Sequence, residues 1–407
     1  MRHILATCAL ALIFPACAAR APGPPASRTA IERPDARDQL QRDLRSMFDA
    51  AEVDHVQWGV NFHSLRDAET LYSLDAFRFM VPASNQKLLT TAVAAARLGW
   101  NYRFTTRVLA TGPIAQDGAV HGDLVIIGNG DPTINPRHPQ RWRAFDAWAA
   151  ALKARGITAI HGNLVGDDNA FDEPGWGVGW AWDNLQYGYG APPSALQFNE
   201  NQVEVLITPG IAPGTPAIIT TSPLGSGLVI DPAVTTAAPG GEVLIDIARV
   251  PGTPVLKVRG QIAMDGRPTT LTASVPNPTR FYLTVVRDAL ARHGIAVSGS
   301  VMDIDDLTTP LMMDGATELL VDWSAPLSEM VDVTMKWSRN IYAETLLLAL
   351  APPGEPATGT RGLEPVRDTL RAWGILADSY MLLDGSCLSR YVYLTDYALT
   401  TLLINFF

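Results

Sequence analysis

A serine and a lysine three residues apart could perform chemistry together. Ser84 and Lys87 lie in the stretch PASNQKLL, and Lys87 is the only one of four lysines with a serine three positions upstream. Residues three apart share a helix face, so the lysine could act as base for the serine hydroxyl if burial lowers its pKa. The alternative is a structural role, because a serine between Pro-Ala and a helical run is a good N-cap.

A second polar pair precedes another helical run. Ser338, Arg339 and Asn340 stand directly before IYAETLLLAL, where helix capping would again suffice. In serine acyl-transfer enzymes without a histidine base, a hydroxyl relays the proton to the leaving amine and an amide orients the substrate backbone. Two such motifs on one chain favour catalysis over accident.

A third polar stretch, LLDGSCLSRY, spans residues 382–391. Its Asp-Gly-Ser is typical of a turn. Its Arg390 is either a solvated surface charge or a planar fork that binds a carboxylate.

The segments that must position these motifs mix helices and strands. Residues 34–51 space leucines four apart and predict an amphipathic helix, and 56–65 and 69–80 alternate like paired strands before the Ser84 helix. Short β-rich runs follow, with one helical piece at 140–156, which predicts an α/β region and then a mostly β region. The helical run 278–294 and a strand within 295–303 come next. We expect one domain in two parts, 34–104 and 279–407, interrupted by an inserted region at 105–278.

Composition excludes several classes of function. The chain has 407 residues, 47% of them hydrophobic, and a formal net charge of −10. Phosphate backbones need clustered Lys and Arg, so a nucleic-acid partner is excluded. The seven histidines include no pair at metal-ligand spacing on one helix, and we predict no metal and no cofactor.

The N-terminus is typical of an export signal. Arg2 precedes an apolar run and small residues, so residues 1–19 are predicted as a signal peptide and 20–33 as a Pro-rich linker. Cleavage would release an exported, periplasmic protein; the alternative is a lipoprotein anchored through Cys17. In either case Cys387 is the one free thiol expected in the mature fold.

These motifs together resemble a known family. The stretches SNQK (84–87), SRN (338–340) and DGSCLSRY (384–391) resemble the class C low-molecular-mass penicillin-binding proteins, which are D-alanyl-D-alanine carboxypeptidases and endopeptidases. The resemblance continues, in the family's order, through GNGDPTI, VGDDNAFD, WAWDNLQYGYGAPPSAL, VRGQIAMDG and LARHGIAVSGSV. It implies an α/β (α+β) fold: a serine β-lactamase/DD-peptidase-like transpeptidase domain with a large inserted α/β and β-rich region.

The resemblance also implies roles for the matching catalytic residues. Ser84 would be the acylated nucleophile and Lys87 its base, with Ser338 and Asn340 as proton relay and substrate-orienting pair. The implied substrates are peptidoglycan stem peptides, and β-lactam antibiotics would be covalent inhibitors.

Residues around the cleft would recognise the diaminopimelate side chain of the substrate. Tyr189 would line the cleft, and Asp183, or Asn184 in its place, would hold the ammonium group. Leu388 and Arg390 match a segment that contacts the same side chain, where Arg390 would bind its carboxylate.

The sequence departs from the family in two places. None of its four lysines is followed by Thr-Gly, the family's third motif, so the chain reads as truncated before that motif and is expected to be weak or inactive as a peptidase. Cys387 stands where the family has a glycine, in a turn that would need positive φ.

Three other functions compete with the peptidase. The first is a catalytically impaired peptidoglycan-binding protein, which the missing Lys-Thr-Gly favours. The second is a β-lactamase, against which the long insertion argues. The third, dinucleotide binding at GNGDPT, is poor because Asp131 and Pro132 stand where a phosphate-facing helix should begin.

Overall fold

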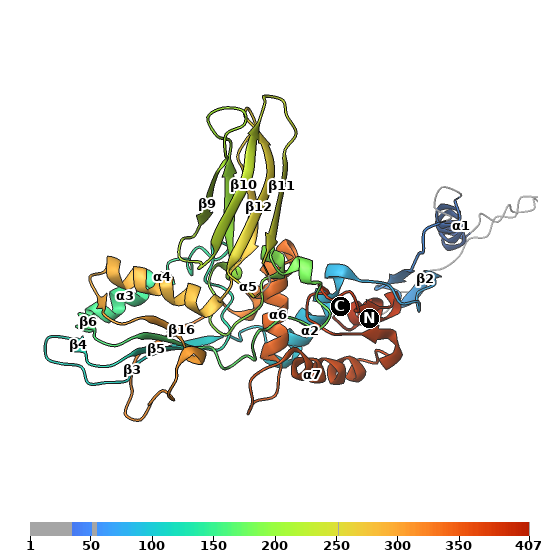
Figure 1. Ribbon diagram of the computed structural model, residues 1–407. Coiled ribbons are helices and arrows are strands. Elements are labelled where there is room, and N and C mark those ends of the chain that lie inside the picture. The colour runs from blue at the N-terminus through green and yellow to red at the C-terminus, as the bar shows by residue number, and fades with distance from the viewer. Residues whose placement is uncertain (1–34, 51–54, 251, 407) are drawn as a thin grey trace, which may run out of the picture. The chain divides into compact units, whose positions relative to one another are not determined.

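A computed structural model describes residues 35–50, 55–250 and 252–406 (Figure 1). The predicted signal peptide, the linker and Cys17 lie outside these residues. The chain divides into two compact units, Met1–His55 and Val56–Phe407. In the first, the predicted amphipathic helix is present as α1 (Ala36–Phe48), and the side chain of Asp35 caps it by accepting a hydrogen bond from the backbone N–H of Arg37.

In the second unit, helices gather around α2 (Gln86–Leu98). Its apolar positions Leu89 and Val93, four residues apart, are buried on one face. Four helices from the C-terminal part of the chain pack against it: α5 (Leu327–Trp337), α6 (Asn340–Ala349), α7 (Gly359–Ala372) and α8 (Asp396–Phe406). This packing brings residues some 250 positions apart to the start of α2.

Two short antiparallel strand pairs accompany the helices. β1 (Val60–Ser64) pairs with β2 (Glu69–Leu74), which confirms the predicted strand pairing. β17 (Tyr380–Met381) pairs with β18 (Tyr393–Leu394) and closes the loop that carries the third polar motif. Leu394 also bridges Met80, so that loop is tied to the chain just before Ser84.

A five-stranded sheet forms the largest sheet of the described chain, in the order β15-β7-β5-β3-β16. Helices α3 (Ala144–Ala154) and α4 (Pro278–Arg292) lie side by side against it (Figure 1). Helix α4 begins where Asn277 accepts a hydrogen bond from the N–H of Arg280. The strands are β3 (Thr105–Ala110), β5 (Leu124–Gly128), β7 (Leu164–Asp167), β15 (Val301–Asp303) and β16 (Thr317–Trp323).

Glycines divide two β-rich stretches, residues 157–168 and 295–303. Each stretch contributes to two sheets: β6 (Ala159–Ile160) and β14 (Ala296–Val297) join β4 (Ala119–Val120), whereas β7 and β15 join the five-stranded sheet. Gly162 and Gly299 lie at the breaks, and a Cβ on Gly299 would lie 2.4 Å from the carbonyl oxygen of Gly162. Only glycine allows backbones to approach this closely, so the strands bend together there.

The region after residue 201 is rich in β-structure, as predicted. It forms two three-stranded sheets, β13-β8-β9 and β10-β12-β11 (Figure 1). In the first the alternating residues Val203, Val205 and Ile207 face the core. The strands are β8 (Gln202–Thr208), β9 (Ile218–Ser222), β10 (Val229–Ala237), β11 (Leu244–Arg249), β12 (Val255–Ala263) and β13 (Thr269–Ser274).

The five-stranded sheet joins strands from both sides of residue 279. β15 and β16 follow this residue and pair with β7 and β3, which precede it. Among the described residues, no helix is both long enough and apolar enough to cross a membrane.

Candidate active site

Ser84 sits in a turn that leads into α2. The turn, η2 (Ala83–Asn85), presents Ser84 to solvent, whereas Lys87 one turn later is only 1% exposed. No side-chain cap is formed at either helix start, so the N-cap interpretation of Ser84 is wrong. Its hydroxyl oxygen instead accepts a hydrogen bond from Lys87 Nζ at 2.9 Å.

Ser338 and Asn340 reach the same point from the break between α5 and α6. Ser338 has left-handed backbone angles, with φ of 53°, and its hydroxyl donates to Ser84 Oγ at 2.7 Å. Lys87 Nζ donates to Asn340 Oδ1 at 2.7 Å and lies 3.4 Å from Ser338 Oγ. The four residues proposed from separate motifs therefore form one hydrogen-bonded cluster.

Burial changes the chemistry of the lysine. It lowers the pKa of Lys87 from 10.5 to about 8, although the negative charges of Glu344 and Asp384 oppose the shift. A substantial fraction of Lys87 is thus neutral near pH 8, and a neutral amine beside a hydroxyl can accept its proton. Ser84 also stands at a helix N-terminus, which favours negative charge.

The DGSCLSR segment lies against Lys87. Asp384 is 1% exposed and accepts hydrogen bonds from the N–H groups of Cys387 and Ser389, at 2.8 and 2.7 Å, and from Trp180 Nε1 at 2.9 Å. This folds the segment so that the Ser386 carbonyl lies 3.4 Å from Lys87 Nζ. Cys387 has φ of 62°, which confirms the positive φ expected there.

Glu344 is a second buried acid, which the sequence reasoning missed. It is 5% exposed on α6, and its carboxylate oxygens accept from the N–H of Gly385 at 3.0 and 3.1 Å. Burial and the neighbouring charge of Asp384 raise the pKa of Glu344 to about 8. Near neutral pH Glu344 is therefore largely protonated. A glutamate inside an apolar helical run was the available signal.

The predicted substrate-binding residues lie in two segments around the cluster. Tyr189, half-exposed, donates its hydroxyl to Asn184 Oδ1 at 3.1 Å, and its carbonyl accepts from Asn340 Nδ2 at 2.9 Å. Burial and the charge of Asp183 raise the pKa of Tyr189, and the charge of Arg390 opposes this, so both charges lie near that ring. Leu388 is half-buried, whereas Asp183 and Arg390 are exposed.

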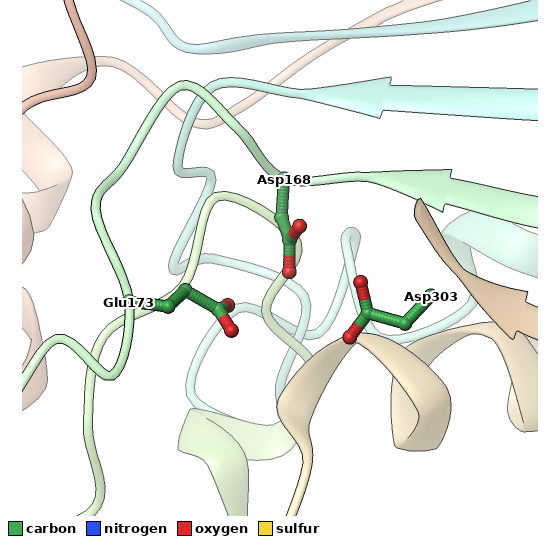
Figure 2. Close-up of side chains that lie close together, drawn as sticks. All are labelled: Asp168, Glu173 and Asp303. Atoms are coloured by element: carbon green, nitrogen blue, oxygen red, sulfur yellow. The ribbon is translucent and has the colours of Figure 1, made fainter. Parts of the chain in front are cut away.

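Away from this cluster, three carboxylates point toward one another (Figure 2). Oxygens of Asp168, Glu173 and Asp303 lie within 4.8 Å of each other, a spacing that could hold a cation and that the histidine-based reasoning did not consider. Thr279 donates to Asp168 and Asn277 donates to Asp303. Burial and the contact with Asp168 raise the pKa of Glu173 to about 8, so the cluster retains a proton at neutral pH.

A nucleophilic hydroxyl, a buried amine with lowered pKa, a second hydroxyl and an amide make a site for acyl transfer. Comparison with known proteins agrees. The family model for the D-Ala-D-Ala carboxypeptidase 3 (S13) family matches residues 40–406. A D-alanyl-D-alanine carboxypeptidase of Actinomadura sp. (strain R39) is 31% identical over 86% of this chain and 65% of its own length. The DacB carboxypeptidase of Haemophilus influenzae is 28% identical over 77% of this chain and 63% of its own length.

Solved structures give the same result for the fold. The crystal structure of penicillin binding protein 4 (dacB) from Haemophilus influenzae matches with a TM-score of 0.74 and 26% identity, over 85% of this chain and 74% of that one. The same protein complexed with a β-lactam matches with a TM-score of 0.68. The predicted fold class, a DD-peptidase/β-lactamase-like α/β fold with several sheets, is confirmed.

Proposed function

The chain belongs to the D-Ala-D-Ala carboxypeptidase 3 (S13) family, and from this premise we propose that it is a serine-type D-Ala-D-Ala carboxypeptidase and endopeptidase of peptidoglycan. The observation that carries the proposal is the contact of 2.9 Å between Ser84 Oγ and the buried Lys87 Nζ. Because the chain spans about two thirds of the length of its curated relatives, activity is proposed here for the residues present.

The proposed reaction proceeds through an ester on Ser84. Its Oγ attacks the carbonyl carbon of the D-Ala-D-Ala bond while Lys87 takes the hydroxyl proton. The C–N bond then breaks, and the proton passes from Lys87 through Ser338 to the departing amine. Water repeats these steps on the ester and restores Ser84. Asn340 would orient the substrate backbone, and the N–H of Ser84 would stabilise the oxyanion.

The rim residues would bind the rest of the substrate. We propose that Asp183 or Asn184 holds the ammonium of diaminopimelate and that Tyr189 lines the cleft. Arg390, beside Leu388, would bind the carboxylate of the same side chain. The ammonium and the carboxylate of this substrate side chain require an acid and an arginine near each other. The charges of Asp183 and Arg390 both influence the pKa of Tyr189.

The proposal extends to inhibitors and location. β-Lactams would acylate Ser84 because they mimic the acyl-D-Ala-D-Ala bond. The substrate lies in the cell wall, so the protein would be exported to the periplasm. Anchoring through a lipid on Cys17 remains the alternative to a released form.

Release of D-alanine from a peptide ending in L-Lys-D-Ala-D-Ala tests the function. Enzyme is used in excess and single turnovers are followed, so that the chemical step is measured directly. The rate is expected to rise with pH, with a midpoint near 8, because Lys87 must be neutral to accept the proton and its pKa is about 8. Ser84→Ala should release none. D-alanine release that is equal in Ser84→Ala would contradict the proposal.

A peptidoglycan-binding protein without peptidase activity is the second candidate. Sedimentation with purified peptidoglycan but no Ser84-dependent D-alanine release would support it. Repeated turnover of benzylpenicillin, in place of a lasting adduct, would instead indicate a β-lactamase.

A further inference from the structure

Both chain neighbours of Ser338 are held by side chains from the region between α2 and α4. The guanidinium carbon of Arg137 lies 4.8 Å from the ring centroid of Trp337, the residue before Ser338. Arg339, the residue after it, donates from Nε to Glu200 Oε2 at 2.6 Å and from Nη2 to the same oxygen. The middle residue of the motif therefore binds a carboxylate more than 130 positions upstream.

Glu200 links the two contacts. Its other oxygen, Oε1, accepts from Arg137 Nε at 2.8 Å. Trp337, Arg137, Glu200 and Arg339 thus form a closed set of contacts around Ser338, which we name the clamp. The Glu200 side chain is only 5% exposed, and a carboxylate so buried requires its cationic partners.

The backbone around Glu200 has an unusual conformation. Asn199, Glu200 and Asn201 have consecutive positive φ of 51°, 58° and 53°, a disfavoured run outside glycine. Side-chain bonds hold it: Asn199 Nδ2 donates to the Gln202 carbonyl at 2.7 Å, and Asn201 Nδ2 to the Pro192 carbonyl at 2.9 Å. Such strain persists only where the surroundings fix it, and here it delivers the carboxylate to Arg339.

Ser338 needs external support because it lies between two helices. It ends α5 in the left-handed conformation, and α6 starts at Asn340. Its side chain must nevertheless stay 2.7 Å from Ser84 Oγ. A displacement of about 1 Å at such a contact can cost a factor of about 100 in rate.

We infer that Glu200 and Arg137 are positioning residues that fix the Ser338 hydroxyl against Ser84 by holding Trp337 and Arg339. The inference rests on the proposed function, because it assigns these residues to the acylation step. They act through the neighbours of Ser338 and transfer no proton themselves. In this arrangement Arg137 and Glu200, which lie between α2 and α4 in the chain, set the distance between the hydroxyls of Ser338 and Ser84.

Stopped-flow acylation by benzylpenicillin tests the clamp by separating the dissociation constant of the initial complex from the limiting acylation rate. Glu200→Gln is expected to lower the limiting rate about 10- to 100-fold and to change the dissociation constant less than about threefold. Arg339→Gln should behave alike, and the double variant should be no slower than the worse single one. Arg339→Lys should recover part of the rate, since it keeps the charge but not the planar fork.

A matched control uses another partly buried ion pair, Arg141 with Asp322, at 2.5 Å. Asp322→Asn should keep the wild-type acylation rate. If Glu200→Gln does not fold, Arg339→Gln, whose side chain is 26% exposed, carries the test alone. An unchanged limiting rate in folded variants, or additive losses in the double variant, overturns the inference. If the wild-type protein is not acylated at all, the proposed function is contradicted, and the inference that rests on it is overturned as well.

Discussion

Replacing Lys87 with methionine is expected to lower the rate of Ser84 acylation by benzylpenicillin about 10³-fold. The only amine that contacts Ser84 Oγ in the described chain is Lys87 Nζ. Methionine fills similar space without a base, but it also removes the hydrogen bonds of Lys87 Nζ to Ser84 and Asn340. Circular dichroism and thermal unfolding therefore establish that the variant is folded before the loss of rate is assigned to the missing base.

A matched control is available in Lys336, whose side chain is 70% exposed and pairs with Asp332. Lys336→Met should acylate at the wild-type rate. The acylation rate is measured from the fluorescence of the protein after reaction with a fluorescent penicillin for increasing times. Acylation of Lys87→Met within threefold of wild type would contradict the role assigned to this lysine.

Replacing Asp384 with alanine is expected to reduce the free energy of unfolding by about 4 kcal/mol. Three donors lose a charged acceptor: the N–H groups of Cys387 and Ser389, and Trp180 Nε1. These three donors would remain buried, because Asp384, which they contact, is only 1% exposed, and a buried donor without a partner destabilises the folded state. Relief of repulsion with Glu344 offsets only part of this loss.

Urea denaturation measures the change. Asp368→Ala serves as control because the Asp368 side chain is 63% exposed and pairs with Arg371 on the same helix. That variant should lie within about 0.5 kcal/mol of wild type. A loss below about 1 kcal/mol in Asp384→Ala would show that the loop is held by other contacts.

The four central residues were accessible from sequence because each lies in a short local motif. Ser84 and Lys87 are three residues apart, so helix geometry places them on one side. Ser338 and Asn340 lie in one short motif, but they are brought together by the left-handed backbone of Ser338 between α5 and α6. That the pairs meet depends on how α2 and α6 pack. The family resemblance supplied that step, because spacing within each motif says nothing of the distance between motifs.

The supporting residues were not accessible in the same way. Glu200 is held in a run of positive φ, which its two asparagine neighbours favour. The sequence does not show that this run brings the Glu200 carboxylate to Arg339. Arg339 lies between Ser338 and Asn340 in the motif, and nothing in the motif indicates that a buried carboxylate binds it. Glu344 sits in a helix whose apolar pattern suggests only a core. Each of these residues takes its partner from a distant segment.

The sequence pattern predicts where β-strands occur, but not where a strand is interrupted. The sequence predicts β-structure on both sides of Gly162 and of Gly299. It does not show that each glycine separates strands of two different sheets, β6 from β7 and β14 from β15. The bend arises from the close approach of Gly162 and Gly299, a contact between segments that local sequence cannot reveal.

The most direct test of the central claim is intact-mass spectrometry of the purified chain with and without excess benzylpenicillin, beside Ser84→Ala. A nucleophile formed by Ser84 and Lys87 predicts one penicilloyl adduct on wild type and none on the variant. No adduct on a folded wild-type chain, or an equal adduct on Ser84→Ala, would contradict the proposal that Ser84 is the acylated residue.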